Sequence, residues 1–91
     1  NDMSEDKLKR LKTEGQLLEQ ILKQESSSSE NAVVALKELE GVFNQVKSMN
    51  QYYVLGRIRL DRLFIEGDLA NNIELADCYS RFANLAEGLE V

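Results

Sequence analysis

The side chains that could carry out catalysis are few in this 91-residue chain, and they lack the partners that catalysis requires. The sequence has no histidine and one cysteine. Hydrolytic enzymes pair a nucleophile with a base, or place two carboxylates with different pKa values in one cleft. No histidine exists to act as the base, and Glu38 and Glu40 point to different faces of the helix on which they are expected to lie. We therefore expect no enzymatic activity.

Metal and cofactor sites are not expected either. Cys78 has no second cysteine or histidine to accompany it, whereas zinc sites need several such ligands at set spacing. Its thiol also has no neighbour that would ionise it, so we expect a small core residue. The glycines are isolated and form no phosphate-binding loop. They are Gly15, Gly41, Gly56, Gly67 and Gly88.

The charge distribution argues against nucleic acid as a partner. The net charge is −5, and residues 68–91 carry 5 acidic residues against Arg81. Proteins bind phosphate backbones mainly through clustered lysine and arginine. Arg57, Arg59 and Arg62 are the nearest approach to such a cluster. Asp61 and Glu66 follow Arg57 and Arg62 by four residues, the spacing of ion pairs on one helix face, which favours a solvated, self-neutralised surface.

Neither a membrane span nor a secretion signal is visible in the sequence. The longest uninterrupted apolar run, Ala32 to Leu36, is far shorter than the roughly 20 residues that cross a bilayer. No charged and apolar leader opens the chain. A single cysteine also fits a reducing compartment. We expect an intracellular protein, cytoplasmic or nuclear, with no membrane partner.

The main structural signal is a series of apolar residues spaced by three and four from Ala32 to Leu63. This spacing predicts a helix over about 31–66, because such residues share one helix face. One unbroken helix would be about 50 Å long. Gly41 and the polar residues Ser48 to Gln51 are its weak points, and a break there would give two ordinary helices. The unbroken register favours one long or gently kinked helix. The series comprises Ala32, Ala35, Leu39, Val42, Val46, Met49, Tyr53, Gly56, Leu60 and Leu63.

Two further helices are predicted, over about 4–25 and 71–88. Gly67 is expected to end the central helix as a left-handed glycine, and Asn71 with Glu74 fits a capping pair at the start of the last helix. The chain is thus a single all-α domain, 1–91. It is a small helical bundle, or a coiled-coil-like helical hairpin, of three to four helices with one long central helix. The apolar stripes of the outer helices are Leu8, Leu11, Leu18 and Leu22, and Leu75, Cys78, Phe82, Leu85 and Leu89.

The serine-rich connector 26–30 separates the first two helices. Consecutive serines favour caps and turns over helix interiors, so a serine or Asn31 is expected to cap the following helix. The alternative is regulatory, because Ser27 stands three residues before Glu30 in an acidic context and is a candidate phosphorylation site.

The segment 52–66 is expected to contact more than one partner. On a helix, Val54, Ile58 and Ile65 would form a second apolar face, opposite the main stripe. Either this helix lies between its two neighbours, or the second face docks another protein. Tyr52 is the best candidate for a binding hot spot. The predicted interface residues are Tyr52, Val54, Ile58, Arg62 and Ile65.

These observations favour a non-catalytic protein–protein interaction module that binds another chain, its own copy or a different one, by helix packing. It would serve as a dimerisation unit or as a small subunit of a larger helical assembly. A small acidic bacterial secretion or assembly chaperone is the alternative. A regulator that binds nucleic acid through its arginines ranks third.

Overall fold

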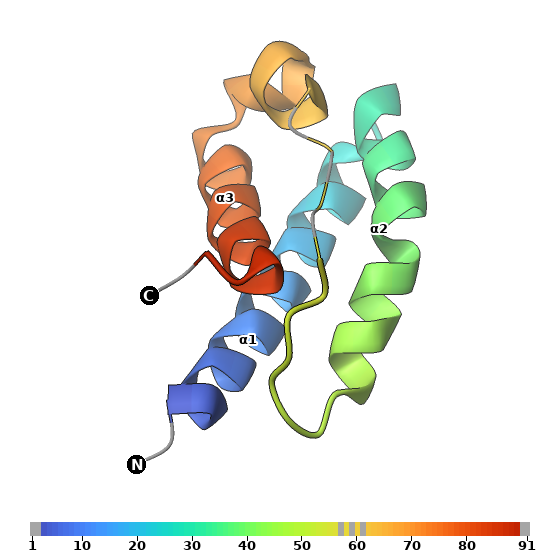
Figure 1. Ribbon diagram of the computed structural model, residues 1–91. Coiled ribbons are helices and arrows are strands. Elements are labelled where there is room, and N and C mark those ends of the chain that lie inside the picture. Colours follow the sequence, from blue (N-terminus) through green and yellow to red (C-terminus); the bar gives the residue numbers. More distant parts are fainter. Residues whose placement is uncertain (1–2, 57, 59, 61, 90–91) are drawn as a thin grey trace.

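Three α-helices and one long extended segment make up most of the chain in the computed structural model (Figure 1). The structure describes residues 3–56, 58, 60 and 62–89, and only the backbone of residues 3, 4, 65 and 66. The helices are α1 (Met3–Glu25), α2 (Glu30–Ser48) and α3 (Ile73–Glu87). A π-helical turn, η1 (Arg62–Glu66), and a 3₁₀ turn, η2 (Asp68–Asn71), precede α3. The all-α fold class is as the sequence predicts.

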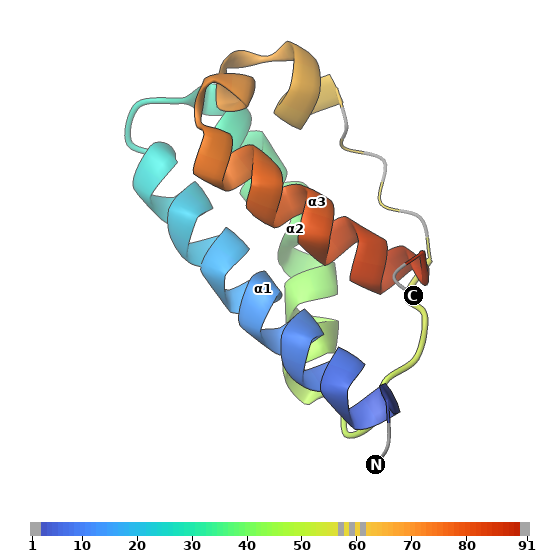
Figure 2. The same cartoon turned by 90° about the vertical axis from the view of Figure 1, so that its left-hand side faces the viewer.

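Helix α1 is the centre of the bundle, because it packs along both α2 and α3 (Figure 2). Its buried leucines, Leu11, Leu18 and Leu22, recur on one face at helical spacing. The rings of Phe43 on α2 and Phe82 on α3 meet at a centroid distance of 5.8 Å. The apolar stripes predicted from the sequence therefore form one shared core. Among the described residues, no helix is long and apolar enough to cross a membrane.

The prediction of one long central helix over 31–66 is wrong. Helix α2 ends at Ser48, and Met49 adopts an extended conformation with φ −65° and ψ 133°. The break falls at the polar residues that the sequence marks as a weak point. A rod of about 50 Å would project well beyond α3, which is about 22 Å long, and its second half would find no surface to pack against. Breaking the helix allows the following apolar residues to return to the bundle.

Residues 49–56, 58 and 60 lie in that returning segment, which we call the strap. Figures 1 and 2 show it running between α2 and α3 on the side of the bundle away from α1. Met49 and Ile58 are buried in the core, and Tyr52, Leu55 and Leu60 pack against it. The strap thus closes the third side of the bundle, where a longer helix was expected.

A set of polar side chains joins the connector between α1 and α2 to the turn before α3. Ser29 caps α2, since its hydroxyl oxygen accepts from the Ala32 amide at 3.3 Å. The same hydroxyl donates to Asp68 at 2.7 Å, and the Asn31 amide donates to the other Asp68 oxygen at 2.8 Å. Hydrogen bonds from Ser29 and then Asn31 lower the pKa of Asp68 below its usual 3.8. The capping role expected of a connector serine is confirmed.

The start of α3 lies one residue later than predicted. Asn72, and not Asn71, is the N-cap, because Asn71 still belongs to the 3₁₀ turn. The Asn72 side chain accepts from the Leu75 amide at 3.1 Å and donates to Glu25 at 2.8 Å. We call Glu25, Ser29, Asn31, Asp68 and Asn72 the polar clamp.

Gly67 does not act as the predicted left-handed helix end. Its φ is −92°, which other residues also adopt. A glycine is favoured here because there is little room for a side chain. A Cβ on residue 67 would lie 3.0 Å from the Leu63 carbonyl oxygen and 3.1 Å from the side-chain amide nitrogen of Asn31.

Candidate protein-binding surface

The strap is held on the end of α3 by hydrogen bonds to the last helical carbonyls, which have no donors within the helix. The Tyr52 hydroxyl donates to the Leu85 carbonyl at 2.6 Å. The amides of Leu55 and Gly56 donate to the Ala86 carbonyl at 2.8 and 3.3 Å. Gly56 has a φ of +109°, a conformation that glycine adopts without a steric penalty. The strap therefore serves as the C-terminal cap of α3.

Ile58 anchors the strap in the core and is 8% exposed. Its amide donates to the Glu87 carboxylate at 3.1 Å, and its carbonyl accepts from the Tyr79 hydroxyl at 3.4 Å. The Tyr79 ring stacks on Phe64 at a centroid distance of 4.0 Å. Both backbone groups of Ile58 and its side chain are thus engaged within this chain.

Two apolar side chains, Val54 and Leu89, remain exposed where the strap meets the end of α3, and the exposed Tyr53 precedes Val54 in the sequence, with its hydroxyl bound by Gln45 of α2. Val54 is 54% exposed, Leu89 64% and Tyr53 44%. Val54 lies against Gly88, since a Cβ on that glycine would come within 2.8 Å of the valine Cγ2. Gly88 is left-handed, with φ +78°, and precedes Leu89 directly. We call Tyr53, Val54 and Leu89 the strap surface.

Of the five residues predicted as an interface, the four whose side chains the structure describes differ in their exposure. The prediction assumed a helix over this segment, and the described residues of the strap are not helical. Val54 is exposed and Ile58 is buried. Tyr52 is half-buried, and Arg62 is exposed on the π-helical turn. The side chain of Ile65 lies outside the described part of the chain. Their role in binding stays a prediction.

Sequence reasoning missed Tyr53 and Leu89 as surface residues. Helical spacing predicts both in apolar stripes that face the core, because in the sequence this spacing continues over the strap and past Gly88. The signal that marks the end of α3 is Gly88 itself, a common residue at a helix C-terminus. The expected ion pairs of Arg57 with Asp61 and of Arg62 with Glu66 involve residues, or side chains, outside the described part of the structure.

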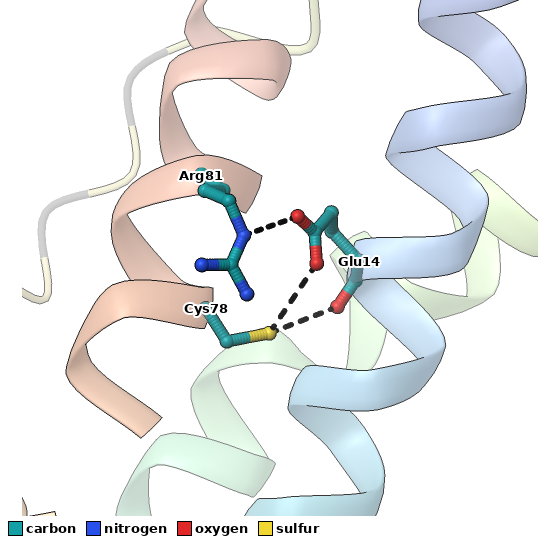
Figure 3. Close-up of polar contacts among 3 residues, drawn as sticks. All are labelled: Glu14, Cys78 and Arg81. Carbon is teal, nitrogen blue, oxygen red and sulfur yellow. Dashed lines mark hydrogen bonds and ion pairs between the residues drawn. The ribbon is translucent and has the colours of Figure 1, made fainter. Parts of the chain in front are cut away.

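A second polar group, Glu14, Cys78 and Arg81, joins α1 to α3 (Figure 3). The buried Cys78 thiol donates to the Glu14 carbonyl at 3.4 Å, and the Glu14 carboxylate pairs with Arg81 Nε. Burial, and then the negative charge of Glu14, raise the pKa of Cys78 to about 11. The same carboxylate raises the pKa of Arg81. At neutral pH the thiol is protonated, which suits a packing contact and not a nucleophile.

The remaining candidate chemistry lies outside these two groups. Within the described residues, no three side chains of histidine, cysteine, aspartate or glutamate gather as a metal site. Ser27 is exposed, and its hydroxyl donates to the Gln24 carbonyl at 3.0 Å at the end of α1. Phosphorylation of Ser27 stays a prediction.

No protein-family model, curated protein or solved structure matches this chain. The function is therefore inferred from the geometry of the strap and its surroundings.

Proposed function

We propose that this chain is a non-catalytic protein-binding module that contacts another protein chain through the strap surface. The observation that supports this most directly is the exposure of Val54 and Leu89, at 54% and 64%, next to Gly88, because Val54 lies against that glycine and Leu89 follows it in the sequence. A single exposed apolar residue is common on soluble proteins. Two that meet at one glycine, together with the exposed Tyr53 ring that precedes Val54 in the sequence, offer a small apolar anchor for a partner.

The hydrogen bonds between the strap and α3 support the same proposal. Tyr52, Leu55, Gly56 and Ile58 all hold the strap to α3 by hydrogen bonds. A surface that is already ordered loses less conformational entropy on binding, so more of the contact energy remains as affinity. Tyr53 adds an aromatic ring whose hydroxyl accepts from Gln45 at 3.1 Å, which restrains its orientation.

The partner is a second copy of this chain or another helical subunit. The exposed side chains of the strap surface are apolar and carry no charge, so they suit a partner that presents an apolar helix face. Sedimentation equilibrium of the purified chain separates the two cases, because a dimerisation unit associates by itself and a subunit of a larger assembly does not.

Substitution of Val54 by Asp tests the proposal, with Ile73→Asp as the matched control. Ile73 is 75% exposed and begins α3, about 22 Å along the helix axis from Gly88. If the chain dimerises, Val54→Asp gives a monomer and Ile73→Asp remains a dimer. If the chain is monomeric, the two variants and the unmodified chain serve as baits, and the specific partner is absent only from the Val54→Asp sample.

The proposal fails if the unmodified chain is a monomer and all three baits recover the same proteins. Thermal melting followed by circular dichroism is the folding control. It must show the same helical content in both variants, because a general loss of fold would remove binding for another reason.

A further inference from the structure

Gly41 lies in the interior of α2, where the fold of this chain gives no reason for a glycine. Glycine is the poorest helix former after proline, so it weakens the helix unless its small size is needed. Gly41 is exposed, and no described atom lies within 4 Å of the position that a Cβ would take. Its φ is not positive, unlike that of Gly56 and Gly88. The missing side chain therefore leaves open space on the outside of the helix.

The face of α2 around Gly41 has an apolar group at each end. Val34, seven residues before Gly41, is 44% exposed. Gln45, four residues after Gly41, is exposed and donates to the hydroxyl of Tyr53, which is also 44% exposed. Residues four and seven apart share one side of a helix. The bare backbone at Gly41 thus lies between two apolar side chains, a shape that lets a second helix approach closely and contact both.

The charges on α2 indicate which helix fits this face. The exposed charged residues of α2 before Gly41 are three glutamates and Lys37, a net charge of −2. After Gly41, α2 carries only Lys47, which pairs with Glu19 of α1 at 3.0 Å. Two copies of α2 that crossed in parallel would set the acidic halves against each other. Antiparallel copies avoid this repulsion, because each acidic half faces the half that carries Lys47.

We propose that α2 packs antiparallel against α2 of a second copy of this chain, and that the two helices cross at Gly41. The two-fold axis of the dimer then passes beside this glycine. Val34 of each copy faces Ser48 of the other, since both lie seven residues, or about 10 Å, from Gly41. Tyr53 makes this face continuous with the strap surface. The inference therefore rests on the proposed function, and it names a second copy as the partner.

Gly41→Ala and Gly41→Leu test the crossing, with sedimentation equilibrium as the measurement. Both substitutions improve helix propensity, so the melting temperature in dilute solution should rise. Both also fill the place where the helices meet, so the dissociation constant of the dimer should rise at least about ten-fold, and further for leucine. Ser80→Ala and Ser80→Leu are the matched controls and should leave it unchanged, because Ser80 is a small exposed residue on α3. A loss of fold cannot make the chain more stable and its dimer weaker.

The orientation of the two helices is tested by mixing two samples of the full chain. One sample carries a nitroxide on Ser48→Cys and no isotope, and the other is labelled with nitrogen-15. An antiparallel crossing broadens the amide signal of Val34 in the labelled copy. A parallel crossing broadens the signal of Ser48 instead, and this result would overturn the proposal.

The failure of this inference is distinguishable from the failure of the proposed function. A chain that is monomeric at every concentration overturns the inference and leaves the proposed function open to a different partner. A dimer that dissociates with Val54→Asp and not with Gly41→Leu also overturns the crossing, whereas the proposed function stands. The reverse result supports the crossing at Gly41 and refutes the strap surface as the main contact.

Discussion

Replacing Tyr52 by Phe removes one hydroxyl and tests whether the strap is the cap of α3. That hydroxyl donates to the Leu85 carbonyl at 2.6 Å. The amide four residues later, on Leu89, donates to Asn84 instead, at 2.9 Å. Among the residues that the structure describes, Tyr52 is therefore the donor to the Leu85 carbonyl. The ring stays in place, and so does its contact with the Lys7 ammonium 5.6 Å away, so the substitution isolates the hydrogen bond.

The expected loss of stability follows from the environment of this bond. A neutral hydrogen bond contributes about 1 kcal/mol net, and an acceptor left unpaired in a partly buried place adds to that, giving about 1.5 kcal/mol in total. In a domain of this size, 1 kcal/mol corresponds to about 4–8 °C in the melting temperature, so Tyr52→Phe should melt about 6–12 °C lower. Thermal and urea denaturation followed by far-ultraviolet circular dichroism measure both quantities.

Tyr53→Phe is the matched control for this measurement. The Tyr53 side chain is 44% exposed, and its hydroxyl accepts from Gln45, itself an exposed residue. Losing that contact should change stability by no more than about 0.5 kcal/mol, as at other surface positions. Equal losses for Tyr52→Phe and Tyr53→Phe would show that the strap does not cap α3 in the way described.

Four more predictions concern two helical glycines, the polar clamp and the thiol. Gly15→Ala should destabilise the fold by about 1 kcal/mol, because its Cβ overlaps Phe82 and this outweighs the better helix propensity of alanine. Gly41→Ala, with nothing within 4 Å of its Cβ, should raise the melting temperature. The lowered pKa of Asp68 gives a stabilisation that is complete above pH 3.8 and is lost as the pH falls through the lower folded value. The gap in urea midpoint between the unmodified chain and Asp68→Asn should therefore shrink below pH 3.8. A pKa raised from 9.0 to about 11 leaves about 100-fold less thiolate at neutral pH. Iodoacetamide should accordingly label Cys78 at least that much more slowly in the folded chain than in urea, and equal rates would contradict its burial.

The sequence was sufficient for the parts of the fold in which helical spacing reports a helix. Most of the α1 stripe, of the first half of the central stripe and of the stripe from Leu75 to Leu85 is buried as expected, and Leu8 and Val42 are partly buried. The serine cap at the start of α2 was also predictable, because a hydroxyl that accepts from a free helical amide is a local interaction. These features depend on residues three or four apart, which a sequence displays directly.

The strap was not predictable in the same way, because two different structures can produce similar apolar spacing. Its inward residues Tyr52, Leu55 and Ile58 recur every three positions. An extended chain that twists with a period of about three resembles a helix with a period of 3.6 when only a few residues are compared. Contacts with residues far away in the sequence favour the extended strap over a helix. Ile58 reaches Glu87, 29 residues later, and Tyr52 reaches Leu85, 33 residues later.

The strap surface was therefore missed in part. Val54 was predicted to be available to a partner, and it is exposed. The reason given, a second face of a helix, was wrong. Leu89 was placed in a buried stripe, although α3 ends at Glu87 and the left-handed Gly88 redirects the chain.

The polar clamp has a consequence for how the molecule opens. Helix termini usually fray one by one and exchange their amide hydrogens first. Here the Ser29 hydroxyl donates a hydrogen bond to the Asp68 carboxylate, 39 residues away, and the Asn72 side-chain amide donates one to the Glu25 carboxylate, 47 residues away. We therefore expect the last turn of α1 and the first turns of α2 and α3 to separate in a single event, so that their slow amide hydrogens exchange for deuterium at a common rate.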